Sequence, residues 1–367
     1  MHPAVRRLER ILSRNIDGAL LGIVLALLAL GLVVLVSASN LNAARITGQI
    51  TNILVALALL WLAANTPPHY LMRLALPLYV AGVLMLVATA LFGETAQGAR
   101  RWLDLGVTRV QPSEFMKIAV PLALAWYFDR HEKTLRLANY AVALLMLVIP
   151  VALIARQPDL GTAVLITAAG FFVLFLAGLS WRIIAGAAIA GAAALPLLWS
   201  ALRDYQRQRI LTLLDPSQDP LGAGYHTIQS MIAVGSGGWL GKGWLNGSQT
   251  HLDFIPERTT DFVFAVFAEE FGLLGCVVLL GLYLAAISRG MLITANAPTL
   301  FTRLLCGAIT LTFFTYAFVN MGMVSGILPV VGVPLPFVSY GGTALASICL
   351  GFGILMSINS HKKLVQT

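Results

Sequence analysis

The stretch from Gly18 to Ala38, GALLGIVLALLALGLVVLVSA, contains no charged side chain. A transmembrane helix needs about 20 predominantly apolar residues, so this stretch is long enough to cross a bilayer. The same criterion, applied along the rest of the chain, predicts further spans near residues 48–64, 72–92, 113–128, 138–155, 160–178, 182–199, 262–287, 300–323 and 337–358. The sequence therefore predicts an all-α, polytopic membrane bundle of about ten transmembrane helices.

The composition agrees with this prediction. Hydrophobic residues make up 58% of the chain and charged residues 11%, with a mean hydropathy of +0.84, whereas soluble domains carry roughly 25% charged residues. We expect one integral membrane domain over residues 1–367. The first span is too long for a cleavable signal peptide, and no small-residue cleavage site with a soluble domain follows it.

The net charge of +8 does not indicate a nucleic-acid partner, because the chain has no basic tract long enough for one. Membrane lipids with anionic headgroups fit the excess better. In the short loops, Lys and Arg favour the side that holds both termini, which predicts that both termini are cytoplasmic. Cys276, Cys306 and Cys349 lie in apolar runs, so neither a disulfide framework nor a metal cluster is indicated.

The longest segment between spans, residues 200–261, is predicted to be a structured extracytoplasmic loop, since long ordered loops are usually functional. Its sequence predicts an amphipathic helix over 203–214, a turn at 215–220 and a second helix over 225–234. Residues 93–111 form another outer loop, rich in Gly and Arg. Residues 324–336 are uncharged and contain three prolines, which predicts an irregular, re-entrant element packed against protein.

The glycine-rich stretch 235–247 superficially resembles a nucleotide phosphate loop. It lacks the first glycine of that motif, and Gly243 replaces the Ser or Thr that should follow the lysine. Two interpretations stay open. The stretch is a flexible loop, or its backbone amides and Lys242 approach a phosphate group of a ligand other than a nucleotide.

Charged residues within predicted spans are candidates for function, because burying a charge in a membrane is costly. Glu114 and Lys117 are three residues apart on one helical face, after Pro112, which is predicted to occupy the first helical position. They form either a mutually neutralising pair or part of a polar cavity that opens to the outer face. Glu269 and Glu270 are expected about 12–14 Å below the outer end of their span. Two adjacent acids cannot both face one partner, so we expect at least one to be structural.

The most distinctive stretch is LDFIPERTTDF at 252–262, at the outer end of the eighth predicted span. Thr260 or Asp261 is expected to cap that span, and Glu257 and Arg258 can pair with each other or with neighbours. Asp253 lies between Leu252 and Phe254, in a stretch that we expect to be apolar enough to limit the solvation of its carboxylate. It is a candidate general base, and a solvated surface residue is the alternative.

Six motifs occur in an order that resembles the SEDS family (shape, elongation, division and sporulation) over essentially the whole chain. They are GARRWL at 98–103, QPSE at 111–114, QPDLGT at 157–162, GSQT at 247–250, PERTTDF at 256–262 and PLPFVSYGG at 334–342. The LDFIPER wording resembles the elongation type rather than the division type. The chain has Thr259 where the family often has His, so no role for an imidazole is carried over.

The resemblance implies a peptidoglycan glycosyltransferase that polymerises lipid II, the undecaprenyl-diphosphate-linked disaccharide precursor, into β-1,4 glycan strands during cell elongation. It places the essential Asp of the family on Asp253. It also implies a class B penicillin-binding protein as partner. No organic cofactor is expected, and a divalent cation (Mg or Mn) with unknown ligands is possible. The residues available to bind the substrate diphosphate are Arg101, Arg109, Glu114, Lys117, Lys242 and Arg258.

Two other functions fit the composition. A lipid II flippase would also need many spans and buried charges, but the sequence shows no inverted repeat and no paired broken helices. A non-catalytic scaffold for the crosslinking enzyme would use the charges for assembly. The concentration of charged motifs at the outer face favours the enzyme.

Overall fold

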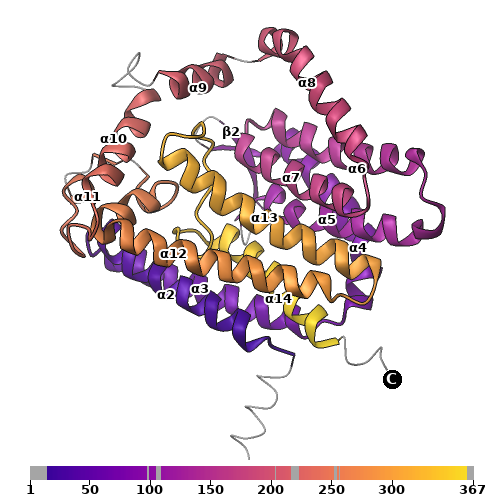
Figure 1. Ribbon diagram of the computed structural model, residues 1–367, viewed down its shortest axis with the longest axis horizontal. Coiled ribbons are helices and arrows are strands. Elements are labelled where there is room, and N and C mark those ends of the chain that lie inside the picture. The colour runs from indigo at the N-terminus through magenta and orange to yellow at the C-terminus, as the bar shows by residue number, and fades with distance from the viewer. Residues whose placement is uncertain are drawn as a thin grey trace, which may run out of the picture.

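The computed structural model describes residues 15–96, 99–104, 109–202, 204–215, 223–251, 254–255 and 257–361. Its framework is a bundle of long helices, as predicted (Figure 1): α2 (Gly18–Ala38), α3 (Ala43–Ala64), α4 (Pro68–Phe92), α5 (Pro112–Arg130), α6 (Leu137–Arg156), α7 (Leu160–Leu176), α8 (Trp181–Ala201), α12 (Val263–Ala295), α13 (Leu300–Val324) and α14 (Gly342–His361). A short 3-10 helix, Glu132–Thr134, joins α5 to α6. The prediction of a polytopic helical membrane protein is confirmed.

Seven of these helices are long and apolar enough to span a membrane by length and composition. Helices α7 and α8 are apolar but give shorter apolar segments, and α5 carries charged residues near both of its ends. These three helices complete the ten predicted spans. We use "outer end" for the end of the bundle that holds the last turns of α2 and α13 and the first turns of α5 and α14, after the predicted orientation.

Helix α13 lies at the centre of the bundle, between α12, α7 and α5 (Figure 1). Its polar face is buried, including Thr302, Thr310 and Asn320. Helices α3 and α14 pack along much of their length, and the position of Gly353 shows why. A Cβ on Gly353 would lie 2.3 Å from the carbonyl oxygen of Leu60. Small residues at such contacts let membrane helices approach closely.

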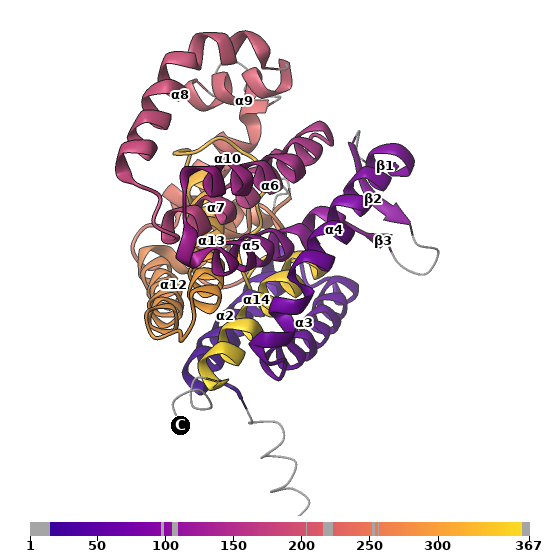
Figure 2. The same cartoon turned by 90° about the vertical axis from the view of Figure 1, so that its right-hand side faces the viewer.

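A small antiparallel sheet projects from the outer end, beside the end of α4 (Figure 2). It consists of β1 (Glu94–Ala96), β2 (Ala99–Asp104) and β3 (Arg109–Val110), in the order β1-β2-β3. The sequence predicted only a loop for this segment, because runs of two to six residues with several Arg and Gly carry little strand signal.

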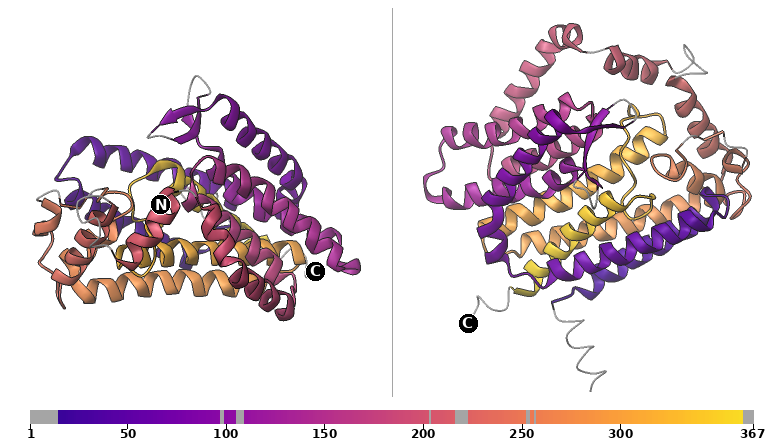
Figure 3. Two further views of the ribbon diagram at one scale, coloured as in Figure 1. Left: turned by 90° about the horizontal axis from the view of Figure 1, so that it is seen from above. Right: turned by 180° about the vertical axis from the view of Figure 1, so that it is seen from behind.

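The described residues between α8 and α12 form three helices: α9 (Asp204–Leu214), α10 (Ala223–Ser236) and α11 (Ser248–His251). The two helices predicted for this segment are confirmed as α9 and α10. Most of the predicted turn at 215–220 lies outside the described residues. Helices α8 and α9 form an arch that stands away from the rest of the bundle and leads to α10 (Figures 1 and 3).

Residues 325–341 are irregular and largely buried, as the three prolines of this segment predict. Val333, Leu335 and Phe337 are almost fully enclosed. The Asn320 side-chain amide donates to the carbonyl of Val333 (2.7 Å), and the Tyr283 hydroxyl donates to that of Pro336 (2.6 Å). Because side chains of α12 and α13 satisfy this backbone, the irregular segment extends to Gly341. The last helix therefore begins at Gly342 rather than near 337.

Helix α12 is broken at Gly272, whose φ of 63° and ψ of −162° are not helical. The break leaves a half-helix, 263–271, and a segment of about 34 Å, 273–295, which is long enough to cross the membrane by itself. Residues 237–243, which we call the clasp, take up the backbone groups at the break. The Lys242 and Gly243 amides donate to the Glu269 and Glu270 carbonyls (both 3.0 Å). The Leu273 and Leu274 amides donate to the Gly238 and Trp239 carbonyls (2.9 and 3.1 Å).

The clasp changes two predictions. The glycine-rich stretch is ordered against α12, so the interpretation as a flexible loop is wrong for 237–243. Its Lys242 and Gly243 amides already bind carbonyls, so these two do not bind a phosphate.

The half-helix also corrects the predicted depth of its acids. The backbone carbonyl of Asp261 accepts a hydrogen bond from the Asn320 side chain in the last turns of α13 (2.8 Å), and the Glu270 carboxylate accepts one from Ser37 at the end of α2. Both ends of the half-helix therefore lie near the outer end, rather than about 12–14 Å apart in depth. The predicted cap by Thr260 or Asp261 is wrong as well, since the N-cap residue is Phe262, without a side-chain cap.

At the opposite end of the bundle, Asp17 joins three helices. It caps α2 by accepting from the Leu20 amide (2.9 Å), and it accepts from Arg289 of α12 (2.6 Å) and Asn359 of α14 (2.7 Å). Burial opposes ionisation of this carboxyl, but the Arg289 guanidinium and the Leu20 amide outweigh burial and hold the pKa of Asp17 below its usual range.

We expect Gly272→Ala to destabilise the protein. A Cβ at Gly272 would lie 2.3 Å from the amide nitrogen of Gly241, and alanine disfavours a φ of 63°. The loss of stability should be at least ~2 kcal/mol, measured as a lower unfolding temperature in detergent. Gly281→Ala is the control on the same helix, because nothing lies within 4 Å of its Cβ position. Equal unfolding temperatures for the two variants would contradict this account of the break.

Candidate functional site

Two polar networks lie toward the outer end of the bundle. We call them the α5 network (Gln111, Glu114, Lys117, Asp159, Tyr316 and Ser347) and the loop network (Lys242, Ser248, Gln249, Thr250 and Glu269). The first joins α5, α7, α13 and α14, and the second joins the clasp and α11 to the half-helix of α12. Both include residues that the sequence predicted for substrate binding.

In the α5 network, Glu114 and Lys117 form an ion pair with 2.5 Å between the carboxylate and the ammonium nitrogen. Pro112 occupies the first turn of α5, as predicted, and starts the helix that places both side chains on one face. Ser347 of α14 donates to the other oxygen of Glu114 (3.1 Å), and the Lys117 ammonium lies 5.0 Å from the centre of the Tyr316 ring. The predicted neutralising pair is confirmed.

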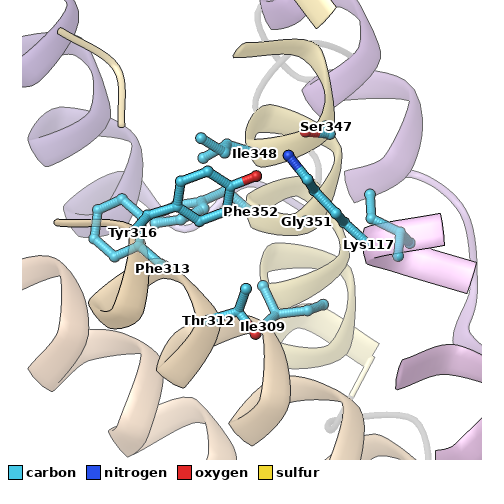
Figure 4. Close-up of a pocket in the computed structure, with 10 residues that line it drawn as sticks. Lys117, Ile309, Thr312, Phe313, Tyr316, Ser347, Ile348, Gly351 and Phe352 are labelled. Carbon is cyan, nitrogen blue, oxygen red and sulfur yellow. The ribbon is translucent and has the colours of Figure 1, made fainter. Parts of the chain in front are cut away.

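The ion pair also borders a pocket between α5, α13 and α14 (Figure 4). The Lys117 ammonium and the Tyr316 hydroxyl point into the same space, close to Ser347, while Phe313, Ile348 and Phe352 supply apolar walls. The buried Thr312 hydroxyl also lines this pocket and has no hydrogen-bond partner within the described part of the chain. The pocket thus combines polar groups with an apolar wall, which is typical of ligand sites. The role of Glu114 and Lys117 in binding substrate stays a prediction.

Gln111 connects this network to α7. Its side-chain amide donates to Asp159 (3.1 Å), whose other oxygen accepts from the Thr162 amide (3.2 Å) and caps α7. The motifs at 111–114 and 157–162 therefore meet. The motifs at 256–262 and 334–342 meet as well. The Tyr340 amide donates to the backbone carbonyl of Thr259 (2.8 Å), and the Ser339 hydroxyl donates to that of Thr260 (2.6 Å).

In the loop network, the carboxylate of Glu269 is fully buried and pairs with Lys242 at 2.7 Å. The same carboxylate accepts from the Ser248 hydroxyl (3.2 Å), the Gln249 amide (3.0 Å) and the Thr250 hydroxyl (3.3 Å). The neighbouring Glu270 points elsewhere and accepts from Ser37. The expectation that two adjacent acids do not share one partner is confirmed.

Arg258 lies near the loop network. Its guanidinium donates to the carbonyl of Thr250, and the Phe254 amide donates to the carbonyl of Gln249 (3.2 Å). These two contacts join residues that precede Asp253 in the sequence to residues that follow it. Asp253 itself lies outside the described residues. Glu257 accepts from the Thr260 hydroxyl (3.1 Å).

For Arg101 and Arg109 the structure describes the backbone only. Arg101 lies in β2, and Arg109 in β3 pairs with Asp104 of that strand. Since Arg109 precedes Gln111 by two residues, the sheet lies beside the first turn of α5 and the α5 network. Their role in binding the diphosphate stays a prediction.

Sequence reasoning missed Tyr316 and Ser347, which lie singly in apolar helices and carry no local signal. It quoted Gln111 and Asp159 within motifs without assigning them a role. The described residues contain no group of three His, Cys, Asp or Glu that could hold a metal ion.

His226 of α10 lies against the 257–262 segment, stacked on Phe262 with 5.8 Å between ring centres. Burial lowers the pKa of His226 below its usual value of 6.5, and the negative charge of Glu257 opposes this shift only in part. The imidazole is therefore held neutral beside the motif.

The chain is similar to several known proteins. A family model for the cell cycle proteins FtsW, RodA and SpoVE matches residues 18–364. The peptidoglycan glycosyltransferase MrdB of Escherichia coli is 51% identical over 353 residues, which cover 96% of this chain and 95% of that protein.

Two solved structures also resemble the chain. One, described as "Structural coordination of polymerization and crosslinking by a peptidoglycan synthase complex", gives a TM-score of 0.83 at 36% identity and covers 96% of this chain and 99% of its own. The other is the rod shape determining protein RodA of Thermus thermophilus, with a TM-score of 0.72 at 30% identity and coverage of 95% and 97%.

Lys117→Ala should lower the stability of the protein by about 3–5 kcal/mol, because it leaves the carboxylate of Glu114 buried without its counter-charge. Ser347→Ala is the matched control, since it removes one hydrogen bond from the same carboxylate and should cost about 1 kcal/mol. Thermal unfolding in detergent measures both. If Lys117→Ala is no less stable than Ser347→Ala, the ion pair does not hold α5 in place.

The depressed pKa of His226 predicts a pH dependence of stability. As the pH falls through 6.5, the unfolded chain takes up a proton at this residue more readily than the folded chain does, so stability falls with the pH. Between pH 7.5 and 5.5 the unfolding temperature of the wild type should therefore fall more than that of His226→Gln. Parallel curves for the two proteins would show that His226 is not held neutral.

Proposed function

This chain belongs to the FtsW, RodA and SpoVE family of cell cycle proteins, as its motifs predict, and from this premise we infer how it works as a peptidoglycan glycosyltransferase. It polymerises lipid II into β-1,4 glycan strands during cell elongation. The observation that carries the proposal is that the motifs shared with the family come together at one end of the bundle. The α5 network, the loop network and the segment 254–262 all lie toward the outer end.

The reaction transfers a glycosyl group from one lipid-linked strand to another. The 4-hydroxyl of the acceptor sugar attacks the anomeric carbon of the donor, a new C–O bond forms, and the bond to the diphosphate breaks. The undecaprenyl diphosphate leaves with the electron pair. Attack opposite the leaving group inverts the anomeric carbon and produces a β linkage.

We assign the general base to Asp253, which accepts the proton of the acceptor hydroxyl. The contacts of Thr250 with Arg258 and of Gln249 with Phe254 support this assignment, because they restrain both sides of the segment that carries Asp253. A base must lie within hydrogen-bond reach of the proton that it removes, and a restrained loop provides that positioning.

The leaving diphosphate needs positive charge more than it needs a proton. Arg101, Arg109, Lys117 and Arg258 are the proposed donors of that charge. Glu114 keeps Lys117 charged and oriented in its pocket while no substrate is bound. Lys242 was predicted for the same purpose from the sequence.

A divalent cation, Mg or Mn, would neutralise part of the diphosphate charge when bound. Mg²⁺ usually binds through one or two carboxylates together with substrate phosphates. The described residues offer no cluster of three protein ligands, so the proposed cation would rely mainly on the diphosphate oxygens.

The proposed partner is a class B penicillin-binding protein that crosslinks the new strand. The structural relative whose description names a peptidoglycan synthase complex supports a partner of this kind. We place the chain in the bacterial inner membrane with both termini in the cytoplasm and the active face outside. The polyprenyl tails would lie against lipid-facing helices.

A lipid II flippase remains the alternative, and one observation suits it. Broken helices are common in transporters, where their free backbone groups bind substrate or ions, and α12 is broken at Gly272. The clasp, however, takes up backbone groups on both sides of this break. The break therefore supports a fixed loop at the outer end better than a transport site.

The test uses the full chain, purified in detergent with its partner and supplied with lipid II and Mg²⁺ or Mn²⁺. Detergent removes the transbilayer step, so glycan strands on a gel report polymerisation alone. Asp253→Asn should lower the rate by at least ~100-fold, as expected for the loss of a general base. The control is Glu132→Gln, an exposed acid at the other end of the bundle. Wild-type strand formation that persists in Asp253→Asn would overturn the assignment, and no strands from the wild type would favour the flippase.

A further inference from the structure

Among the described acids near the proposed active loop, Glu269 is the most enclosed, with 0% of its side chain exposed. It belongs to the half-helix of α12, just before the break at Gly272. An ionised carboxylate in such a place is stable only if other groups satisfy its oxygens and balance its charge. The loop network supplies both.

Three of the groups that satisfy Glu269 come from α11, the short helix at 248–251. The Gln249 amide and the Ser248 hydroxyl contact one oxygen (3.0 and 3.2 Å), and the Thr250 hydroxyl contacts the other (3.3 Å). A carboxylate that accepts from the first amides of a helix holds that end of the helix in place. Glu269 thus anchors the first turn of α11 to the half-helix.

The anchored turn leads directly to the segment that carries Asp253. The Phe254 amide returns to the carbonyl of Gln249 (3.2 Å), and Arg258 donates to the carbonyl of Thr250. Two of the three α11 residues bound by Glu269 therefore also receive the contacts that close this segment. A displacement of α11 would displace both sides of the segment together.

Lys242 supplies the balancing charge. Its ammonium lies 2.7 Å from Glu269 and 2.8 Å from the Ser248 hydroxyl, while its backbone amide donates to the carbonyl of Glu269. The two partners differ in their access to solvent. The Lys242 side chain is 30% exposed and Glu269 is fully buried, so loss of the lysine leaves the more costly unpaired charge.

We propose that Glu269 is a positioning residue for the glycosyl transfer and that Lys242 is its counter-ion rather than a ligand of the substrate diphosphate. Glu269 touches no substrate. It holds α11, and through α11 the residues Phe254 and Arg258 that follow the general base, beside the break of α12. The inference rests on the proposed function, because it concerns the loop of the residue assigned as the base.

A double-mutant cycle separates the two roles of Lys242. The four proteins are wild type, Lys242→Met, Glu269→Gln and the double variant, each as the full chain in complex with its partner. Lipid II polymerisation in detergent gives kcat and KM for each. Lys242→Arg serves as the conservative variant, and Lys133→Met controls for the loss of one positive charge at an exposed position far from the loop.

If Lys242 is the counter-ion, Lys242→Met should lower kcat about tenfold or more, with KM within about threefold of the wild type, because the buried charge distorts the loop. Adding Glu269→Gln should restore kcat to within about threefold of the Glu269→Gln protein, because the neutral pair can still hydrogen-bond to α11. Lys242→Arg and Lys133→Met should stay close to the wild type. Poor folding of Lys242→Met that the second change repairs would also support the proposal.

Three outcomes overturn it. A double variant as slow as Lys242→Met, with a raised KM, would identify the lysine as a substrate ligand. A wild-type kcat for Lys242→Met, or a double variant that fails to fold, would remove the compensation on which the proposal depends. Asp253→Asn in the same assay distinguishes failure of the assigned base from failure of this proposal. Full activity of that variant would overturn the assignment of Asp253 as the base, while the coupling of Glu269 and Lys242 could still be measured.

Discussion

An interrupted helix in an apolar bundle persists only where other groups take up its free backbone N–H and C=O groups, because the membrane interior offers no water to do so. This constraint acts on α12 at Gly272. The clasp meets it with four backbone hydrogen bonds to residues on both sides of the break. The half-helix and α11 take their places from this arrangement, so the break organises elements next to the residue to which we assign the chemistry.

The remainder of the fold collects polar groups around this region from distant parts of the chain. Gln111 reaches Asp159 of α7, and Ser339 in the irregular segment reaches Thr260. Each contact gives a buried polar group a hydrogen bond in place of the one it would make with water. Burying such a group without a partner is costly in an apolar interior. At the other end, Asp17 holds α2, α12 and α14 together. The bundle is thus a rigid support for one polar end, and it suits a protein that holds a lipid-linked sugar there.

The spans could be predicted because apolar runs of helical length are a strong signal. The pair of Glu114 and Lys117 was predictable too, since a spacing of three residues places both on one helical face. The break at Gly272 was not, because nothing local distinguishes this glycine from others in the same run, and its partner is the clasp some 30 residues earlier. For the same reason the contact of Glu269 with Lys242, which depends on the folded clasp, could not be predicted from spacing.

The central claim is that lipid II is bound and joined at the outer end, between the α5 network and the loop network. Cryo-electron microscopy of the full chain with its partner and a non-reacting lipid II analogue tests it most directly. The account predicts the diphosphate against one or more of Arg101, Arg109, Lys117 and Arg258, with the sugar within about 3 Å of the Asp253 carboxylate. A headgroup bound instead at the opposite end, near Asp17, would contradict it.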